Sequence, residues 1–263
     1  MDKEITVALS GSGFKLPALV GAISAIVDMG YTITEIAGTS GGSIIAGLYA
    51  TGMNVSTMKE LAFSTDFVEL MPWRIWGFWN GLSNSDNLFK WLQDHTGHVT
   101  CGETIIPYKA IASNLSLEIP FVFSTETTPA MEVALASVCS ASIPIIYQKR
   151  VVNNFTLCDG GVVNNIPVSH LSKGTKRIGI ALYSSPMDMS SMSLMQYLGR
   201  VIDTMLQANE KTHIYLAKEE NATIIPVNTF GISMLDRKMT LADRTKLYES
   251  GYQSVQKELS HDL

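Results

Sequence analysis

The sequence is poor in charge, and the charge it has is weighted towards acid. Of its 263 residues 16% are charged, and 24 acidic against 19 basic residues give a formal net charge of −5. A protein that coats nucleic acid or an anionic membrane needs an excess of lysine and arginine. The composition therefore argues against a nucleic-acid partner and indicates that any contact with a membrane is mainly apolar. With 46% hydrophobic residues the chain can still bury a substantial core.

Cysteines and long apolar runs are scarce as well. The three cysteines are odd in number and form neither a C-x-x-C pair nor a cluster with histidine, so neither a disulfide framework nor a zinc site is indicated. Residues 1–10 carry acid near their start and too short an apolar run for a signal peptide, and no later segment reaches about 18 consecutive apolar residues. We therefore expect a cytoplasmic protein with reduced thiols, without a signal peptide or a transmembrane segment.

Apolar segments with strand character alternate with segments of helical period. The predicted strands cover residues 5–9, 33–37, 108–115, 121–125, 155–159, 177–183 and 223–227, and the predicted helices cover residues 16–29, 41–51, 190–219 and 241–259. This alternation is typical of a three-layer α/β/α fold with a largely parallel central sheet. No repeat, low-complexity tract or linker interrupts it, so residues 1–263 are expected to form a single domain.

A glycine-flanked serine stands where a predicted strand passes into a helix. The stretch Gly38-Thr39-Ser40-Gly41-Gly42 has the G-x-S-x-G form of a nucleophile elbow, a strained turn in which glycines avoid collisions with the neighbouring strand and helix. The motif by itself is weak, because a glycine-rich turn with Ser40 as a helix cap has the same sequence. Its position between a strand and a helix favours the nucleophile.

A second turn of small residues ends the first predicted strand. It reads SGSGFK over residues 10–15. As a phosphate loop it is incomplete, because Leu16 stands where G-x-G-x-x-G needs glycine and no Gly-Lys-Ser/Thr sequence follows. Alternatively, the backbone amides of Ser12 and Gly13 form an oxyanion hole that stabilises a tetrahedral intermediate. The first two strands of such a sheet can be neighbours, which would bring this turn beside Ser40.

A nucleophilic serine needs a base, and the sequence offers two candidates. Ser40, Asp159 and His170 follow the chain order of an α/β-hydrolase triad. That fold, however, reaches its elbow only after several strands, and the position of His170 in the sequence suggests that it lies away from the mouth of the sheet. Asp159 ends a predicted strand at a Gly160-Gly161 turn, so its carboxylate could act directly as the base. Both candidates stay open, with Asp159 favoured.

Together these motifs resemble the patatin-like phospholipases, lipid acyl hydrolases with a Ser-Asp dyad. The likeness rests on the loop at residues 10–15, on GTSGGSIIAGLYATG around Ser40, on CSASIPIIY at residues 139–147 and on DGGVVNNIPV from Asp159. It implies a patatin-like α/β/α fold, a Ser40–Asp159 dyad with an acyl-enzyme intermediate, and neither metal nor cofactor. The implied oxyanion hole comprises Gly11, Ser12 and Gly13. The implied accessory positions are Lys15, Gly38, Gly42, Gly160 and Gly161.

The sequence departs from the family pattern at two places. Ser12 and Leu16 stand where the loop usually has glycine, and Ser113-Asn114 replaces a Thr-Asp pair common in the central strand. Ser12 still has a backbone amide to donate if the turn accepts a Cβ atom. The altered loop nevertheless raises a second hypothesis, a non-catalytic lipid-binding module. Lys15 fits the basic residue of the family loop or a solvated lysine in the first helical turn.

The resemblance implies phospholipid or lysophospholipid substrates and transient contact with a membrane surface. We therefore expect a cytoplasmic protein that can also bind at the periphery of a membrane. Trp73, Trp76 and Trp79 recur every third residue, which makes one aromatic surface on a helix or tight turn. Tryptophan suits the headgroup boundary of a membrane. We expect this surface to be a membrane contact or a lid over the acyl pocket, with plain core packing as the alternative.

Overall fold

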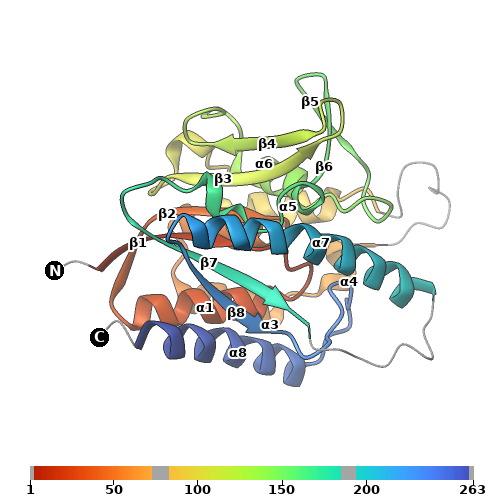
Figure 1. The fold of residues 1–263 in the computed structure, drawn as a ribbon. Coiled ribbons are helices and arrows are strands. Elements are labelled where there is room, and N and C mark those ends of the chain that lie inside the picture. The colour runs from red at the N-terminus through yellow and green to blue at the C-terminus, as the bar shows by residue number, and fades with distance from the viewer. Residues whose placement is uncertain (1–2, 73–82, 185–193, 261–263) are drawn as a thin grey trace.

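The computed structural model describes residues 3–72, 83–184 and 194–260, and its centre is one eight-stranded sheet (Figure 1). The strands are β1 Lys3–Leu9, β2 Tyr31–Thr39, β3 Tyr108–Asn114, β4 Ile119–Ser124, β5 Arg150–Val152, β6 Phe155–Asp159, β7 Lys176–Tyr183 and β8 Thr223–Asn228. Their order across the sheet is β5-β6-β3-β2-β1-β7-β8, and β4 also pairs with β3. Pairs among β3, β2, β1, β7 and β8 are parallel, whereas β4, β5 and β6 pair antiparallel.

Helices cover both faces of the sheet. They are α1 Leu16–Asp28, α2 Gly41–Ala50, α3 Val55–Ser64, α4 Phe67–Leu70, α5 Asp86–Thr96, α6 Val133–Ser140, α7 Leu194–Glu219 and α8 Leu241–Leu259, with short 3-10 helices η1 Cys101–Glu103, η2 Gly160–Val162 and η3 Pro167–His170. Helices α1 and α8 lie together on one side of the sheet, and α7 lies on the other (Figure 1). Among the described residues, none of these helices is long and apolar enough to cross a membrane.

The predicted α/β architecture is confirmed, since every predicted strand and helix is present within a few residues of its expected position. The sheet is mixed only at one edge, where β4, β5 and β6 lie. Helices α3, α4, α5 and α6 and strand β5 were not predicted. Helix α6 is buried almost all round, so its sequence VALASVCS has no polar face to produce a helical period.

Apolar side chains pack on both faces of the parallel strands. In β1, Val7 and Leu9 face the larger core cluster with α1, whereas Ala8 between them faces a second cluster with Val168 and Ala217 of α7. This alternation follows from the two-residue period of a strand, and it explains why β1 reads as a continuous apolar run. Both faces of the sheet are therefore covered.

The three cysteines, Cys101, Cys139 and Cys158, are free and buried. Burial raises the pKa of the Cys101 thiol to about 11 and the pKa of the Cys139 and Cys158 thiols to about 12. Because only the thiolate is a good nucleophile, these three thiols are not candidates for the nucleophile, and the side chains act as small core residues.

Candidate active site

Ser40 occupies a sharp turn between β2 and α2. Its backbone angles, φ 53° and ψ −127°, lie where residues with a side chain are rare. The turn closes because two neighbours lack side chains: a Cβ atom on Gly38 would collide with the backbone of Gly42, and one on Gly42 would lie 2.5 Å from the carbonyl oxygen of Leu9. The strand, turn and helix expected of a nucleophile elbow are thus present.

The strained turn is held from beneath by the end of α6. The backbone amide of Ser40 donates a hydrogen bond of 2.8 Å to the hydroxyl of Ser140, and that hydroxyl donates to the carbonyl of Ile111 in β3. Two residues later, the carbonyl of Ser142 accepts a bond of 2.9 Å from the amide of Asp159. One short segment therefore fixes both Ser40 and Asp159. It lies within the CSASIPIIY stretch, but the sequence assigned Ser140 no role.

Asp159 ends β6 and reaches Ser40 through the sheet, because β6 pairs with β3 at Ala112 and β3 pairs with the end of β2. Ser40 and Asp159 are each only 1% exposed. The Oδ1 atom of Asp159 accepts a bond of 2.8 Å from the amide of Gly161. Among the described residues the Oδ2 atom has no hydrogen-bond partner of good geometry, although the Ser40 hydroxyl lies close enough to lower the pKa of this carboxyl.

Burial is the dominant influence on Asp159. It raises the pKa of this carboxyl to about 6, and the hydroxyl of Ser40 and the amide of Gly161 offset only part of that rise. A carboxyl with such a pKa is ionised at neutral pH and holds a proton more strongly than an ordinary aspartate. These properties suit a general base.

Two glycines and one serine surround Asp159. The glycines leave room for neighbouring segments to pack closely around it, and the serine supports its backbone. A Cβ atom on Gly160 would collide with the carbonyl of Ile111, and one on Gly161 would lie 2.6 Å from Leu206 of α7. The hydroxyl of Ser113 donates a bond of 2.7 Å to the backbone carbonyl of Asp159. Ser113 therefore supports the strand end from the position where the family pattern has threonine.

The loop at residues 10–15 lies beside the elbow, because Leu9 at the end of β1 pairs with Gly38 of β2. The amide of Gly11 donates a bond of 3.0 Å to the carbonyl of Asn165, which corrects the expectation that Gly11 is a third oxyanion donor. Within the described chain, the amides of Ser12 and Gly13 donate to no other residue. The positive φ of the loop, +55°, falls on Gly13, so the turn tolerates the Cβ atom of Ser12.

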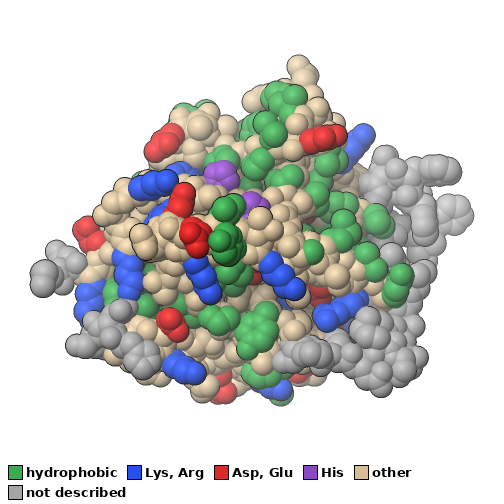
Figure 2. All heavy atoms as spheres, viewed as in Figure 1, with side chains coloured by type: hydrophobic (Ala, Val, Ile, Leu, Met, Phe, Trp, Pro, Cys, Tyr) green, Lys and Arg blue, Asp and Glu red, His purple; other side chains and the backbone are tan. Residues whose placement is uncertain are grey.

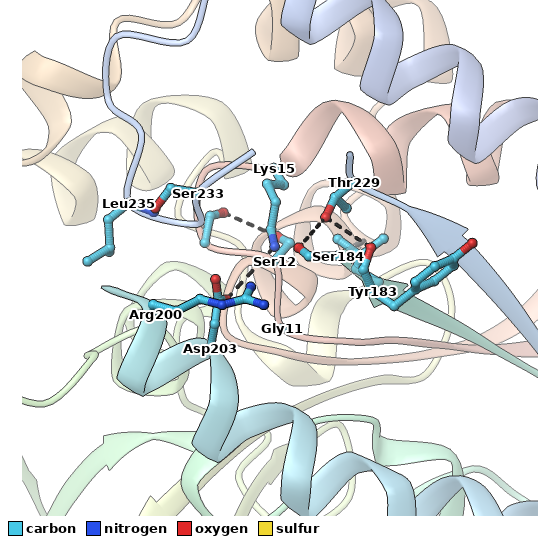
Figure 3. A network of polar contacts seen from close by, with 12 residues as sticks. Gly11, Ser12, Lys15, Tyr183, Ser184, Arg200, Asp203, Thr229, Ser233 and Leu235 are labelled. Carbon is cyan, nitrogen blue, oxygen red and sulfur yellow. Dashed lines mark hydrogen bonds and ion pairs between the residues drawn. The ribbon is translucent and has the colours of Figure 1, made fainter. Parts of the chain in front are cut away.

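Lys15 is buried and is not a solvated lysine. It is 3% exposed, and its Nζ atom lies 3.9 Å from a carboxylate oxygen of Asp203 in α7 (Figure 3). Its ammonium group therefore links the end of the loop to the helix that covers this side of the sheet.

His170 lies in a different part of the fold. Its backbone carbonyl accepts a bond of 2.8 Å from Lys109, and the same lysine donates a bond of 2.6 Å to Glu35. Glu35 precedes Ser40 by five residues of β2, which is roughly 16 Å of extended chain. Burial, followed by Lys109 and His213, lowers the pKa of His170. The triad hypothesis therefore has no geometric support, and Asp159 is the base candidate beside Ser40.

An apolar cavity that opens to solvent is lined in part by Ser40 and Gly13. Its walls come from several elements and include Ile44, Phe67, Leu70, Leu88, Trp91 and Ile143. Apolar walls of this kind suit a fatty acyl chain whose ester carbonyl lies at the serine. Trp91 is thus part of the wall, whereas Trp73, Trp76 and Trp79 lie outside the described residues.

Solved structures of low sequence identity share the fold. VipD from Legionella pneumophila is 14% identical with a TM-score of 0.68, and the match covers 99% of this chain and 67% of VipD. ExoU, solved in complex with SpcU from the type III secretion system of Pseudomonas aeruginosa, is 17% identical with a TM-score of 0.56, and the match covers 98% of this chain and 53% of ExoU. The chain thus spans about half the length of ExoU, and at these identities the likeness shows the fold alone.

The sequence comparisons identify the family of the chain. The protein named "Uncharacterized protein YqhO" of Bacillus subtilis is 28% identical over 277 residues, covering 92% of this chain and 93% of that protein. "Probable lipid hydrolase 463L" of Invertebrate iridescent virus 6 is 30% identical over 184 residues, covering 62% of this chain and 61% of that protein. The family model for patatin-like phospholipase matches residues 7–172, the range that contains the turns around Ser12, Ser40 and Asp159. The chain belongs to the patatin-like phospholipase family, and its membership supports activity as a lipid hydrolase.

Proposed function

We propose that the protein hydrolyses fatty acyl esters of phospholipids or lysophospholipids, with Ser40 as nucleophile and Asp159 as base. One observation carries the proposal: the Ser40 hydroxyl lies against the buried Asp159 carboxyl in the lining of an apolar cavity, beside two backbone amides that donate to no other residue in the described part of the chain. A nucleophile, a base, an oxyanion site and an acyl-binding wall thus lie within reach of one ester carbonyl.

The reaction then proceeds in two halves. Asp159 takes the proton of Ser40 while the serine oxygen attacks the ester carbonyl, and the amides of Ser12 and Gly13 stabilise the oxyanion. Collapse of the intermediate breaks the ester bond, and protonated Asp159 returns its proton to the departing alcohol. Water next attacks the acyl-Ser40 ester with Asp159 again as base. Collapse of this second intermediate breaks the acyl–serine bond and releases the fatty acid, and Asp159 returns the proton to the Ser40 oxygen. The N-terminus of α2 follows Ser40 directly and adds positive potential at the developing charge.

Contact with the lipid surface is expected to be transient and apolar. A net charge of −5 gives little general attraction to anionic lipid. On the face that carries α7, exposed apolar side chains lie among charged ones of both signs (Figure 2), and they include Tyr197, Val201 and Met205 of α7. Such a surface favours brief adsorption to a bilayer over stable anchoring.

A covalent probe tests whether the site is catalytic. An organophosphonate mimics the tetrahedral intermediate and is expected to add to Ser40, giving a mass shift that Ser40→Ala abolishes and His170→Ala retains. If the native protein formed no adduct, the non-catalytic lipid-binding module would replace the hydrolase. Loss of labelling in His170→Ala, checked for folding, would restore the triad.

Replacing Leu88 with phenylalanine is expected to shorten the acyl cavity. Leu88 is 5% exposed and lines the cavity wall, so the larger ring occupies space that a long chain needs. We expect kcat/KM for long-chain esters to fall about tenfold relative to short-chain esters. Lys90→Phe is the matched control, because Lys90 is exposed on the same helix. An equal fall for all chain lengths would contradict the assignment of the cavity.

Replacing Ser140 with alanine is expected to weaken the support of the elbow. The buried amide of Ser40 loses its acceptor, which lowers the free energy of unfolding by about 1–3 kcal/mol, and kcat falls with it because the turn relaxes. Ser137→Ala is the matched control: Ser137 is buried on the same helix, but its hydroxyl bonds the hydroxyl of Tyr108 and the carbonyl of Ser43 and does not bond the amide of Ser40. Comparison of kcat and urea denaturation for the two variants checks this, and equal kcat values would contradict it.

A further inference from the structure

The face of α7 that meets the catalytic turns carries two buried carboxyl groups that the proposed chemistry does not use. Asp203 is 7% exposed and Glu210 is 5% exposed. They are seven residues apart, so they lie on one face of the helix, two turns from each other. Leu206 lies between them and packs against Gly161, next to Asp159. The two carboxyl groups are therefore aligned along the site.

Glu210 holds Asn165 by a short hydrogen bond, in which the side-chain amide of Asn165 donates to a carboxylate oxygen of Glu210. Asn165 in turn touches the oxyanion loop twice. Its backbone carbonyl accepts the amide of Gly11 at 3.0 Å, and its side-chain oxygen lies so close to Gly11 that a Cβ atom there would collide with it. A continuous chain of contacts thus runs from α7 through Asn165 to the start of the loop.

Asp203 holds the other end of the same loop. Its carboxylate oxygen lies 3.9 Å from the Nζ atom of Lys15, and Figure 3 draws this ion pair. The amides of Ser12 and Gly13 lie between these two attachments, so α7 fixes the oxyanion loop both at Gly11 and at Lys15.

We infer that Glu210 is a positioning residue, which holds Asn165 and through it keeps the amides of Ser12 and Gly13 in place. Its effect on catalysis rests on the proposed function, whereas its effect on the loop does not. Burial raises the pKa of Glu210 to about 7, since Asn165 and Lys15 offset only part of the loss of solvation. Burying a carboxyl group is unfavourable, and well-packed apolar residues often serve stability as well or better. A positioning role in the site explains why a carboxyl group is buried at Glu210.

Glu210→Leu removes the acceptor, Glu210→Gln keeps one, and Glu219→Leu is the matched control on the exposed face of α7. Hydrogen exchange of residues 10–15, measured by mass spectrometry, reports the loop without any substrate. We expect exchange at Gly11 to rise about tenfold or more in Glu210→Leu and to stay native in the other two. On fatty acid release, Glu210→Leu is expected to lower kcat about 10- to 100-fold with KM little changed, because the oxyanion donors are misplaced.

A double-mutant cycle separates positioning from a general structural effect. If Glu210 acts through Asn165, Glu210→Leu adds no further loss of loop protection or of kcat in an Asn165→Ala background. Should Glu210→Leu fail to fold, Glu210→Asp takes its place, since it withdraws the carboxyl by one methylene and is expected to show the same pattern more weakly.

The inference is overturned if exchange and kcat in the Glu210 variant match those of Glu219→Leu, or if its losses and those of Asn165→Ala multiply. If the native protein released no fatty acid while the loop lost protection as expected, the proposed function would fail and the positioning role would stand.

Discussion

Replacing Asp159 with asparagine is expected to lower kcat for fatty acid release by about 10⁴-fold, the size of effect seen when a serine hydrolase loses the group that handles its proton. Asparagine keeps the shape of the side chain and its bond to the Gly161 amide, but it cannot take the proton of Ser40. The measurement is the steady-state rate on lysophospholipid at pH 8, with folding checked by circular dichroism.

His170→Ala is the matched control for this substitution. Because the carbonyl of His170, and not its ring, accepts the bond from Lys109, the alanine variant keeps that contact. Its kcat is therefore expected to stay close to native. A loss in His170→Ala as large as that in Asp159→Asn would show that the wrong base had been chosen.

Asp159 is also expected to determine how kcat/KM falls at low pH. Asp159 must be ionised to accept the proton, and its pKa in the free protein is about 6. We expect kcat/KM to fall tenfold per pH unit below about pH 6 and to be level above pH 7. A limb near pH 4, the range of an ordinary aspartate, would contradict the burial of this carboxyl.

Asp159→Asn is also expected to stabilise the fold at neutral pH. Burial moves the pKa of Asp159 from 3.8 to about 6, and each pKa unit corresponds to about 1.4 kcal/mol. Since the folded protein binds this proton more tightly than the unfolded chain, the contribution to stability is fully present below pH 3.8. It is lost as the pH rises through about 6. Above that pH the ionised carboxyl destabilises the native fold by up to about 3 kcal/mol.

Asparagine is neutral at every pH and escapes this penalty. Urea denaturation at pH 8, 6 and 4.5 is therefore expected to show a stability gain for Asp159→Asn that is largest at pH 8 and shrinks towards acid. Asp94→Asn, an exposed aspartate of α5, is the matched control and is expected to show no such trend. A variant that is less stable than the native protein at pH 8 would contradict the account. A gain would indicate that the site trades stability for activity.

The sequence predicted those features of the site that depend on local signals. An apolar run followed by a glycine-rich turn reveals a strand end, so Ser40, Asp159 and the loop at residues 10–15 could each be found alone. That Ser40 and the loop at residues 10–15 meet also followed from the fold class, because β1 and β2 are parallel and bring their carboxyl ends to one edge of the sheet. Asp159 ends β6, which pairs antiparallel with β3, so its approach to Ser40 did not follow from that rule. The Ser-Asp pairing itself came from the resemblance to a family.

The supporting contacts could not be read from the sequence, because they join segments far apart in the chain. Ser140 bonds Ser40 from a helix whose sequence has no amphipathic period. Gly11 looks like a free oxyanion donor until the carbonyl of Asn165 is found to accept its amide. Glu210 reads as one more polar residue of a long helix, and only the packing of α7 against the site shows that it is buried.

The most direct test of the hydrolase is fatty acid release from vesicles of mixed phosphatidylcholine and lysophosphatidylcholine, measured for the native protein and for Ser40→Ala at equal concentration. Chromatography of the products identifies which ester is cleaved. We expect steady release by the native protein and only background release by Ser40→Ala. Equal release by both, or none by the native protein on either lipid, would contradict it.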